Sequence, residues 1–189
     1  MRFVVILIIL NLVFIHSQTN LLQTPNAKNY SEKLAEYPFR FSPTSAKTII
    51  STLKKTVPLK ISAIEKPLLK DALDGKFESF SIAEAALIAS GVTQKNLRQQ
   101  YLKKMKSIYR GVQNFIPQGS TDKQVASYLL LYLHKYHFKS YDIKSSSLTE
   151  LLDRGVYNCV SSSLLYNILA RRLGLNVRGV EAPEHCFSQ

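Results

Sequence analysis

Apolar residues recur at steps of three and four along the middle of the chain, which is the spacing of one face of an α-helix. The clearest stripe follows Thr93 and is ended by Pro117 and Gly119, two residue types that interrupt helices. Its apolar positions are Leu97, Tyr101, Met105, Ile108, Val112 and Phe115. A second stripe, over residues 121–138, contains Val125, Tyr128, Leu129, Tyr132 and Tyr136. Both stripes predict helices whose apolar faces form a core.

Three positions have the spacing of an N-terminal capping box, in which Ser or Thr precedes Glu or Gln by three residues. The pairs are Ser81 with Glu84, Thr121 with Gln124, and Ser147 with Glu150. Each pair predicts the start of a helix. The last of these helices is short, because Gly155 follows it closely.

The C-terminal stretch combines a helix with strands. A helix is predicted to start at Cys159 and to end at Gly174. Its buried face is predicted to consist of Leu164, Leu165, Ile168, Leu169 and Leu173. Residues 175–181 alternate apolar and polar side chains, as a half-buried strand does. The segment 182–184 turns the chain, and a second strand is predicted to begin at His185.

The first residues have the pattern of a secretory signal peptide. Arg2 precedes an apolar run over residues 3–15, and Ser17 is a small residue at a plausible cleavage position. The run contains Asn11 and is shorter than the about 20 residues that cross a bilayer. We therefore predict that residues 1–17 are a cleaved signal peptide and that the protein is exported, to a periplasm or an extracellular space. The alternative is an uncleaved N-terminal membrane anchor.

Three further segments are expected after the signal. Residues 18–70 form a polar lead-in that is punctuated by prolines, namely Pro25, Pro38, Pro43, Pro58 and Pro67. Residues 71–146 form a helical region. Residues 147–189 carry the change from helical to strand patterns and contain the candidate chemistry.

The chain is strongly basic, with a formal net charge of +12 at pH 7. Much of this charge lies in residues 98–110, where Lys103, Lys104 and Lys106 alternate with apolar positions. We interpret these lysines as the solvated face of a helix. The alternative is a binding surface for an acidic partner such as an anionic envelope polymer. The sequence contains no nucleic-acid motif, and a membrane is expected as a partner only through an uncleaved signal.

Cys159 and His185 are the candidate catalytic residues. The thiolate is the reactive form of cysteine, and a helix N-terminus stabilises negative charge. The N–H groups there can also stabilise the oxyanion that forms during acyl transfer. His185, 26 residues further on, could take the thiol proton and return it to a leaving amine. Asn158 could contribute a side-chain donor to this oxyanion hole, or it could cap the helix.

The sequence around these two residues carries a resemblance that spacing alone does not. The runs 155–175 (GVYNCVSSSLLYNILARRLGL) and 177–185 (VRGVEAPEH) resemble the cysteine helix, the following strand and the histidine of the transglutaminase-like superfamily, in its secreted bacterial form. This resemblance implies a papain-like α+β core, in which a cysteine helix packs on an antiparallel sheet after a helical N-terminal part. It also implies an enzyme without cofactor or metal that hydrolyses protein or peptide amides or transfers their acyl group. Cys159 would form a thioester, and His185 would act as base and acid.

The sequence departs from the family after His185. Members place a third residue, usually Asp, on the next strand, where it orients the imidazole, whereas residues 186–189 include no carboxylate. Glu181 and Glu184 are the nearest acids, but one lies in the preceding strand and the other adjoins His185, so neither is well placed to bond its ring. The resemblance therefore implies a C-terminally truncated core, with the apolar face of the cysteine helix left exposed by missing strands.

Alternatives remain for several of these residues. Cys159 could be a buried helix residue without chemistry, or it could form a disulfide with Cys186. His134 and His137 lie three positions apart on one helix, where we expect surface residues rather than metal ligands. The alternative to an enzyme is a non-catalytic exported binding module that uses the basic helix.

Overall fold

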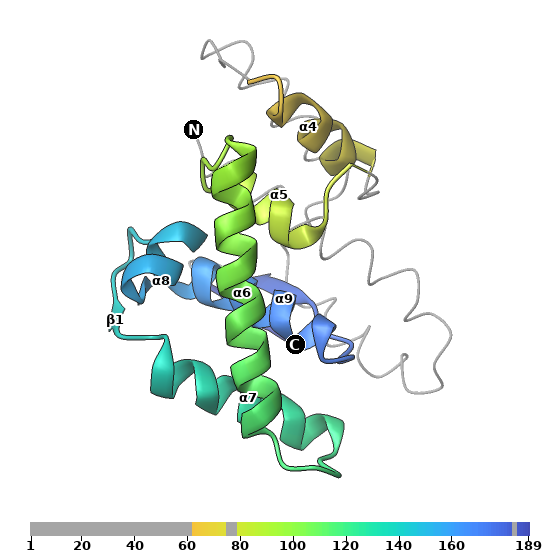
Figure 1. Cartoon of the computed structure of the whole chain (residues 1–189), viewed down its shortest axis with the longest axis vertical. Coiled ribbons are helices and arrows are strands. Elements are labelled where there is room, and N and C mark those ends of the chain that lie inside the picture. The colour runs from red at the N-terminus through yellow and green to blue at the C-terminus, as the bar shows by residue number, and fades with distance from the viewer. Residues whose placement is uncertain (1–61, 75–78, 183–184) are drawn as a thin grey trace.

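The computed structural model describes residues 62–74, 79–182 and 185–189. They form helices that pack around α9 (Cys159–Arg172), together with two small sheets (Figure 1). The other helices are α4 (Glu65–Asp74), α5 (Ile82–Ala89), α6 (Lys95–Phe115), α7 (Asp122–Tyr136) and α8 (Leu148–Arg154). The strands are β1 (Ser140–Tyr141), β2 (Val156–Tyr157), β3 (Gly179–Ala182) and β4 (His185–Ser188). The predicted signal peptide and most of the predicted lead-in lie outside the described residues.

The helices α6, α7, α8 and α9 lie where the apolar pattern predicts them. Two of the predicted capping boxes are complete, because the side chains of Ser81 and Thr121 each accept the amide of the third helical residue and that residue bonds back. The third predicted capping box, of Ser147 with Glu150, does not form. Helix α8 begins after Ser147 as predicted, but the Ser147 hydroxyl bonds the hydroxyl of Thr149 at 2.7 Å instead of capping an amide.

Helix α4 begins inside the segment that was predicted as a polar lead-in. Pro67 lies in the first turn of this helix, where a missing N–H removes no intrahelical hydrogen bond. The helix packs on α5 through Leu68, which is fully buried against Ala85 and Ile88. Pro67 therefore belongs to a helix start and not to a loop.

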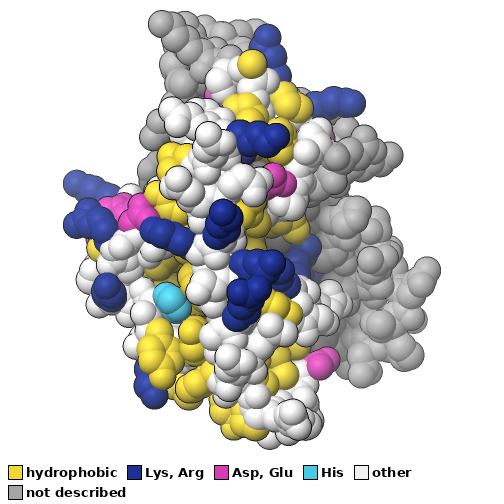
Figure 2. All heavy atoms as spheres, viewed as in Figure 1, with side chains coloured by type: hydrophobic (Ala, Val, Ile, Leu, Met, Phe, Trp, Pro, Cys, Tyr) yellow, Lys and Arg dark blue, Asp and Glu magenta, His cyan; other side chains and the backbone are white. Residues whose placement is uncertain are grey.

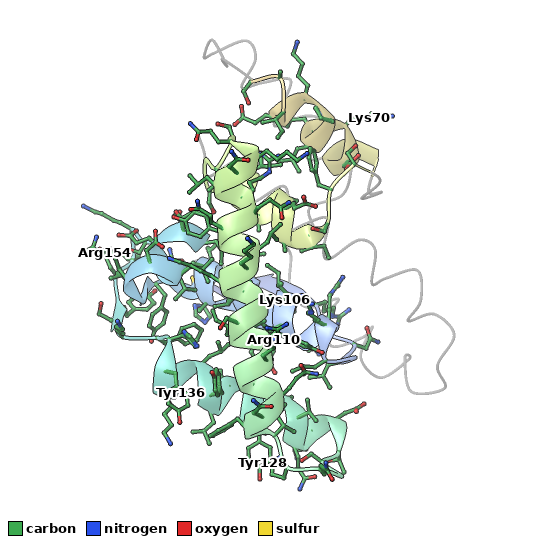
Figure 3. All side chains as sticks on the ribbon, in the orientation of Figure 1. Lys70, Lys106, Arg110, Tyr128, Tyr136 and Arg154 are labelled. Atoms are coloured by element: carbon green, nitrogen blue, oxygen red, sulfur yellow. The ribbon has the colours of Figure 1, made fainter. Side chains whose placement is uncertain are left out.

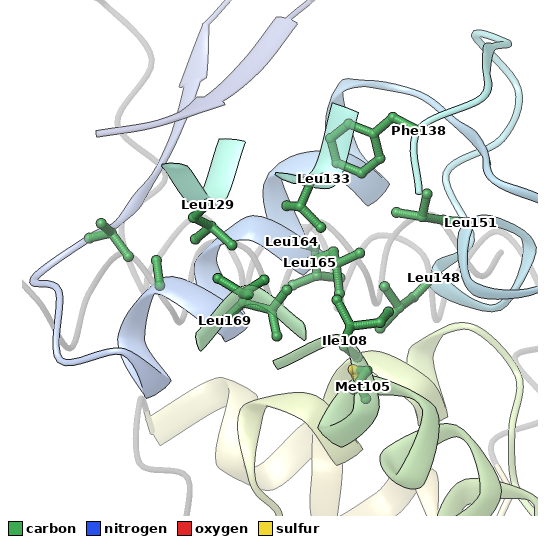
Figure 4. Packing of buried hydrophobic residues seen from close by; sticks show 14 of the residues in the cluster. Met105, Ile108, Leu129, Leu133, Phe138, Leu148, Leu151, Leu164, Leu165 and Leu169 are labelled. Atoms are coloured by element: carbon green, nitrogen blue, oxygen red, sulfur yellow. The ribbon is translucent and has the colours of Figure 1, made fainter. Parts of the chain in front are cut away.

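The main core lies between α9 and the helices around it (Figure 4). Leu164, Leu165 and Leu169 of α9 are at most 1% exposed, and they share one apolar cluster with residues of α6, α7 and α8. The expectation that missing strands would leave this face exposed is therefore wrong, because helices cover it. Helices α6 and α7 approach closely at Gly111, where a larger side chain would overlap the ring of Tyr132.

The two sheets have two strands each. Strands β3 and β4 are antiparallel, with a register that runs from Gly179 opposite Ser188 to Ala182 opposite His185. Strands β1 and β2 are parallel, with Tyr141 opposite Tyr157. Helix α9 contacts both β3 and β4, which confirms the predicted α+β arrangement of a cysteine helix on an antiparallel sheet. Within the ranges that the structure describes, no helix is long and apolar enough to cross a membrane.

Candidate functional site

Cys159 is the first residue of α9, and the residue before it builds the helix start. The Asn158 side-chain oxygen accepts hydrogen bonds from the amides of Val160 (3.0 Å) and Ser161 (3.1 Å). In return, the Ser161 hydroxyl accepts the Asn158 amide at 3.1 Å. This is a reciprocal capping box, which confirms the alternative that Asn158 caps the helix. The bond between the Asn158 amide and Ser161 was not predicted, because the box pairs Asn with Ser instead of Ser or Thr with Glu or Gln.

The cap leaves one amide of the first turn available. The N–H groups of Val160 and Ser161 bond the Asn158 side chain, and the N–H of Ser162 bonds the Asn158 carbonyl. The N–H of Cys159 has no acceptor among the described residues. The Cys159 side chain is partly exposed. A partly exposed cysteine therefore lies at the helix end that favours negative charge, with its own N–H unbonded among the described residues.

His185 lies on a strand that starts near this end of α9. Close to the C-terminal end of the helix, the Arg171 side chain donates to the carbonyl of Val177 at 3.0 Å. Near the N-terminal end, the Ser163 hydroxyl donates to the carbonyl of Cys186 at 3.5 Å. Strand β3 thus runs back along the helix, and β4 begins beside its first turns. The fold brings the segments that carry Cys159 and His185 together.

The histidine ring itself lies on the exposed face of β4. Side chains alternate along this strand, so Cys186 is buried whereas His185 and Phe187 are exposed. The rings of His185 and Phe187 are nearly parallel, with centroids 6.4 Å apart. No hydrogen bond joins His185 to Cys159 or to a carboxylate in the part of the chain that the structure describes. The structure therefore places the start of β4 beside the first turns of α9, without a hydrogen bond between the two side chains among the described residues.

The other predicted roles at the site can be placed as well. Asn158 is 3% exposed and acts as the cap, and its side-chain nitrogen donates to the carbonyl of Ile143 at 3.0 Å. Its role as an oxyanion-hole donor stays a prediction. Cys159 and Cys186 are not joined by a disulfide. The side chains of Glu181 and Glu184 lie outside the described part of the structure.

His134 and His137 pack against aromatic rings. The His134 ring meets Phe138 edge-on at 5.1 Å, and His137 lies 5.6 Å from the ring of Tyr132. Burial, with a smaller effect from the charge of Lys139, lowers the pKa of His137. The described residues contain no group of three His, Cys, Asp or Glu side chains that could hold a metal ion.

Sequence reasoning missed the loop that lies against the start of α9. Besides the Asn158 contact with Ile143, the Ser161 hydroxyl donates to the carbonyl of Ser145 at 2.8 Å. Both cap residues therefore also hold residues 143–145. The only signal in the sequence is the Asn158 and Ser161 pair, which predicts a helix start but does not name the loop that it binds.

A comparison with protein-family models matches residues 99–189 to the transglutaminase-like superfamily. The match begins within α6 and includes α7, α8, α9 and both sheets, so it extends well before the segment that carries Cys159 and His185. Searches of curated proteins and of solved structures gave no match. Residues 99–189 are therefore similar to a transglutaminase-like domain.

Proposed function

We propose that this domain acts on protein or peptide amides through a thioester on Cys159, either by hydrolysis or by acyl transfer to an amine. The observation that carries the proposal is the start of α9. There Cys159 is partly exposed and its own N–H has no acceptor among the described residues, while the neighbouring amides are bonded to the cap. An N–H aimed at a developing oxyanion is one of the strongest contributions to acyl-transfer catalysis.

The proposed reaction has two halves. His185 takes the thiol proton, the sulfur attacks the carbonyl carbon, and the Cys159 N–H donates to the oxyanion. The C–N bond then breaks, and the imidazolium returns the proton to the leaving amine. In the second half, water or an amine attacks the thioester carbonyl and gives a proton to His185. The C–S bond breaks, and the thiol recovers its proton.

This scheme requires His185 to approach the sulfur. Its backbone position at the start of β4 supports such an approach, because Ser163, one turn after Cys159, contacts the residue that follows His185. The ring lies on the exposed face of the strand, next to the exposed ring of Phe187. A rotation of an exposed side chain costs little compared with a backbone change. We expect bound substrate to favour the productive rotamer.

Alkylation by iodoacetamide tests the activation of the thiol. Trypsin places the two cysteines on different peptides, residues 155–171 and 179–189, so each rate can be followed separately by mass spectrometry. At pH 6.5 we expect Cys159 to react at least about tenfold faster than an ordinary thiol, which is mostly protonated at that pH. His185→Ala should remove this advantage, and Cys186→Ala should preserve it. Equal rates in the wild type and in His185→Ala would reject the proposed dyad.

A second candidate function rests on the surface of α6. This helix contains no acidic residue, and Lys103, Lys106 and Arg110 are exposed on it without a carboxylate within 4 Å among the described residues. Figure 2 shows basic side chains gathered along this helix, and Figure 3 shows Lys106 and Arg110 next to each other. Together with the export predicted from residues 1–17, this basic surface supports binding of an anionic envelope polymer.

Charge reversal distinguishes the two candidates. With polyphosphate as the probe, replacement of Lys103, Lys106 and Arg110 by Glu should weaken binding about tenfold at low ionic strength and less at high salt. The same replacement of the exposed Lys66, Lys70 and Lys123, which lie on α4 and α7, serves as the matched control. Equal losses in both variants would indicate attraction by net charge alone. Cys159 alkylation should not change in either variant.

A further inference from the structure

Two exposed apolar side chains stand on the segment next to Cys159. Ile143 has 74% of its surface exposed, the largest fraction of any large apolar residue in the described part of the chain, and Tyr141 has 58% exposed. Tyr141 ends β1, and Ile143 lies in the turn that follows it, which the Ser145 amide closes by donating to the carbonyl of Asp142 at 2.9 Å. Single exposed apolar residues are common on protein surfaces. This pair differs from such residues because hydrogen bonds attach its backbone to the residues that precede Cys159.

The backbone of this segment is fixed to the residues around the sulfur. The side-chain nitrogen of Asn158 donates to the carbonyl of Ile143 at 3.0 Å, and the amide of Asp142 donates to the carbonyl of Tyr157 at 2.9 Å. Tyr157 and Asn158 are the two residues that precede Cys159. Asn158, whose side-chain oxygen caps α9, therefore also holds the backbone of Ile143 through its side-chain nitrogen.

Aromatic rings connect this segment to the core. The ring of Tyr141 meets the ring of Tyr157 edge-on, with centroids 5.8 Å apart and an interplanar angle of 88°. Tyr157 in turn stacks on the buried Phe138, with centroids 4.6 Å apart. One edge of the exposed pair thus continues into the core. An exposed apolar surface beside the helix start that carries a candidate nucleophile is suited to contact a ligand.

We propose that Tyr141 and Ile143 form an apolar subsite that binds a hydrophobic side chain of the acyl donor, next to the amide that Cys159 attacks. The proposal rests on the proposed function for the identity of the ligand. The preferred substrate would then be a peptide with an aliphatic or aromatic side chain close to the reacting carbonyl. Binding would remove apolar surface of Ile143 from water and would position the carbonyl at the Cys159 N–H.

N-alkylmaleimides test the subsite without requiring catalysis. The thiolate adds to the maleimide double bond, and a longer alkyl chain speeds the addition only where apolar surface lies next to the sulfur. We expect N-heptylmaleimide to react with Cys159 about tenfold faster than N-methylmaleimide, the effect of burying one or two methylene groups. Ile143→Ser and Tyr141→Ser should each reduce this ratio, to about two or three in the case of Ile143. Leu131→Ser, at another apolar residue that is 53% exposed, is the matched control.

The outcomes separate this proposal from the proposed function. A ratio that is the same in the wild type, Ile143→Ser and Tyr141→Ser, or one that Leu131→Ser lowers equally, would overturn the subsite. If Ile143→Ser and Tyr141→Ser lose the chain-length effect while their reactivity with iodoacetamide stays at the wild-type level, the subsite is confirmed. If instead the chain-length effect is present and His185→Ala leaves iodoacetamide reactivity unchanged, the subsite stands and the proposed dyad fails.

Discussion

The two sides of α9 differ in what they contact. One side presents Leu164, Leu165 and Leu169, which are almost completely buried among α6, α7 and α8. The other side contacts β3 and β4 and carries polar residues, among them Ser163 and Asn167. Cys159 stands at the end where this polar side begins. One helix therefore anchors the core with one face and presents the candidate chemistry with the other.

Stability and reactivity therefore reside in different parts of α9. The apolar side can be altered without touching the sulfur, and the polar side can be altered without opening the core. Substitutions of the buried leucines should change the free energy of unfolding alone, whereas substitutions at the helix start should also change the rate at which Cys159 reacts. The predictions below separate the two quantities, in order of decreasing effect.

Leu165→Ala should cause the largest loss of stability. Leu165 is fully buried in the main cluster, and removal of such a side chain leaves a cavity that costs about 2–5 kcal/mol. Urea unfolding followed by circular dichroism measures the change. Leu131→Ala, at an exposed apolar position, should stay within about 0.5 kcal/mol of the wild type. A loss below 1 kcal/mol in Leu165→Ala would contradict the assignment of this face as the core.

Asn158→Ala should affect both sides. It removes the cap of α9, which costs about 1–2 kcal/mol, and it releases the loop that contains Ile143. We expect lower stability together with slower alkylation of Cys159. Asn158→Asp retains the capping oxygen but not the donor to Ile143, so it should recover most of the stability. A slower alkylation without any loss of stability in Asn158→Ala would contradict the role of Asn158 as the cap.

Asn167→Leu should change stability little or increase it. Asn167 is 1% exposed, and neither polar atom of its side chain has a hydrogen-bond partner within the described structure. A buried polar group without a partner costs about 1–3 kcal/mol, and a similarly sized apolar side chain avoids that cost. Thermal unfolding compares the variant with the wild type. A clear destabilisation would indicate that Asn167 binds a group that these described residues do not supply.

The smallest effect concerns Asp153 and the pH dependence of stability. Burial alone would raise the pKa of Asp153, but hydrogen bonds from Lys104 and Tyr101 and the charge of Lys104 lower it. The bond to Asp153 is also the main reason why the pKa of Tyr101 rises to about 12. A carboxyl with a lowered pKa in the folded state stabilises the fold above its unfolded pKa of about 4, and the contribution disappears as the pH falls through the folded value.

Asp153→Asn should therefore flatten the decline in stability below pH 4 and should lower the stability slightly at pH 6. The effect is small because both partners of the Lys104–Asp153 ion pair are largely exposed. Urea midpoints at pH 3 and pH 6 measure it. Asp122→Asn, at an exposed carboxylate without an ion pair among the described residues, is the control. Parallel pH profiles in Asp153→Asn and the wild type would rule out this contribution.

The helices could be predicted from the sequence because their signals are local. The apolar stripe of α6 and the capping box of Thr121 each lie within one element and need no knowledge of the rest of the chain. The same holds for Cys159 at the start of a helix and for His185 at the start of a strand. These features are visible within about 30 residues of sequence.

Contacts between distant segments could not be predicted in this way. The cover of Leu165 by helices, the loop held by Asn158 and the burial of Asn167 each depend on residues far away in the chain. The side of the sheet on which the His185 ring lies also depends on the register between β3 and β4, and the apolar pattern of the sequence does not determine that register. The sequence therefore identified the candidate residues. The structure showed that β4, which carries His185, packs along α9, which carries Cys159.

The most direct test of the central claim is acylation by p-nitrophenyl acetate. In the wild type we expect a burst of nitrophenolate of about one equivalent, acetyl on the peptide 155–171, and then slower turnover as the thioester is hydrolysed. Cys159→Ser should abolish the burst, and His185→Ala should slow both phases by about a hundredfold or more. Acetyl on other residues only, or a His185→Ala variant with the rates of the wild type, would contradict the account.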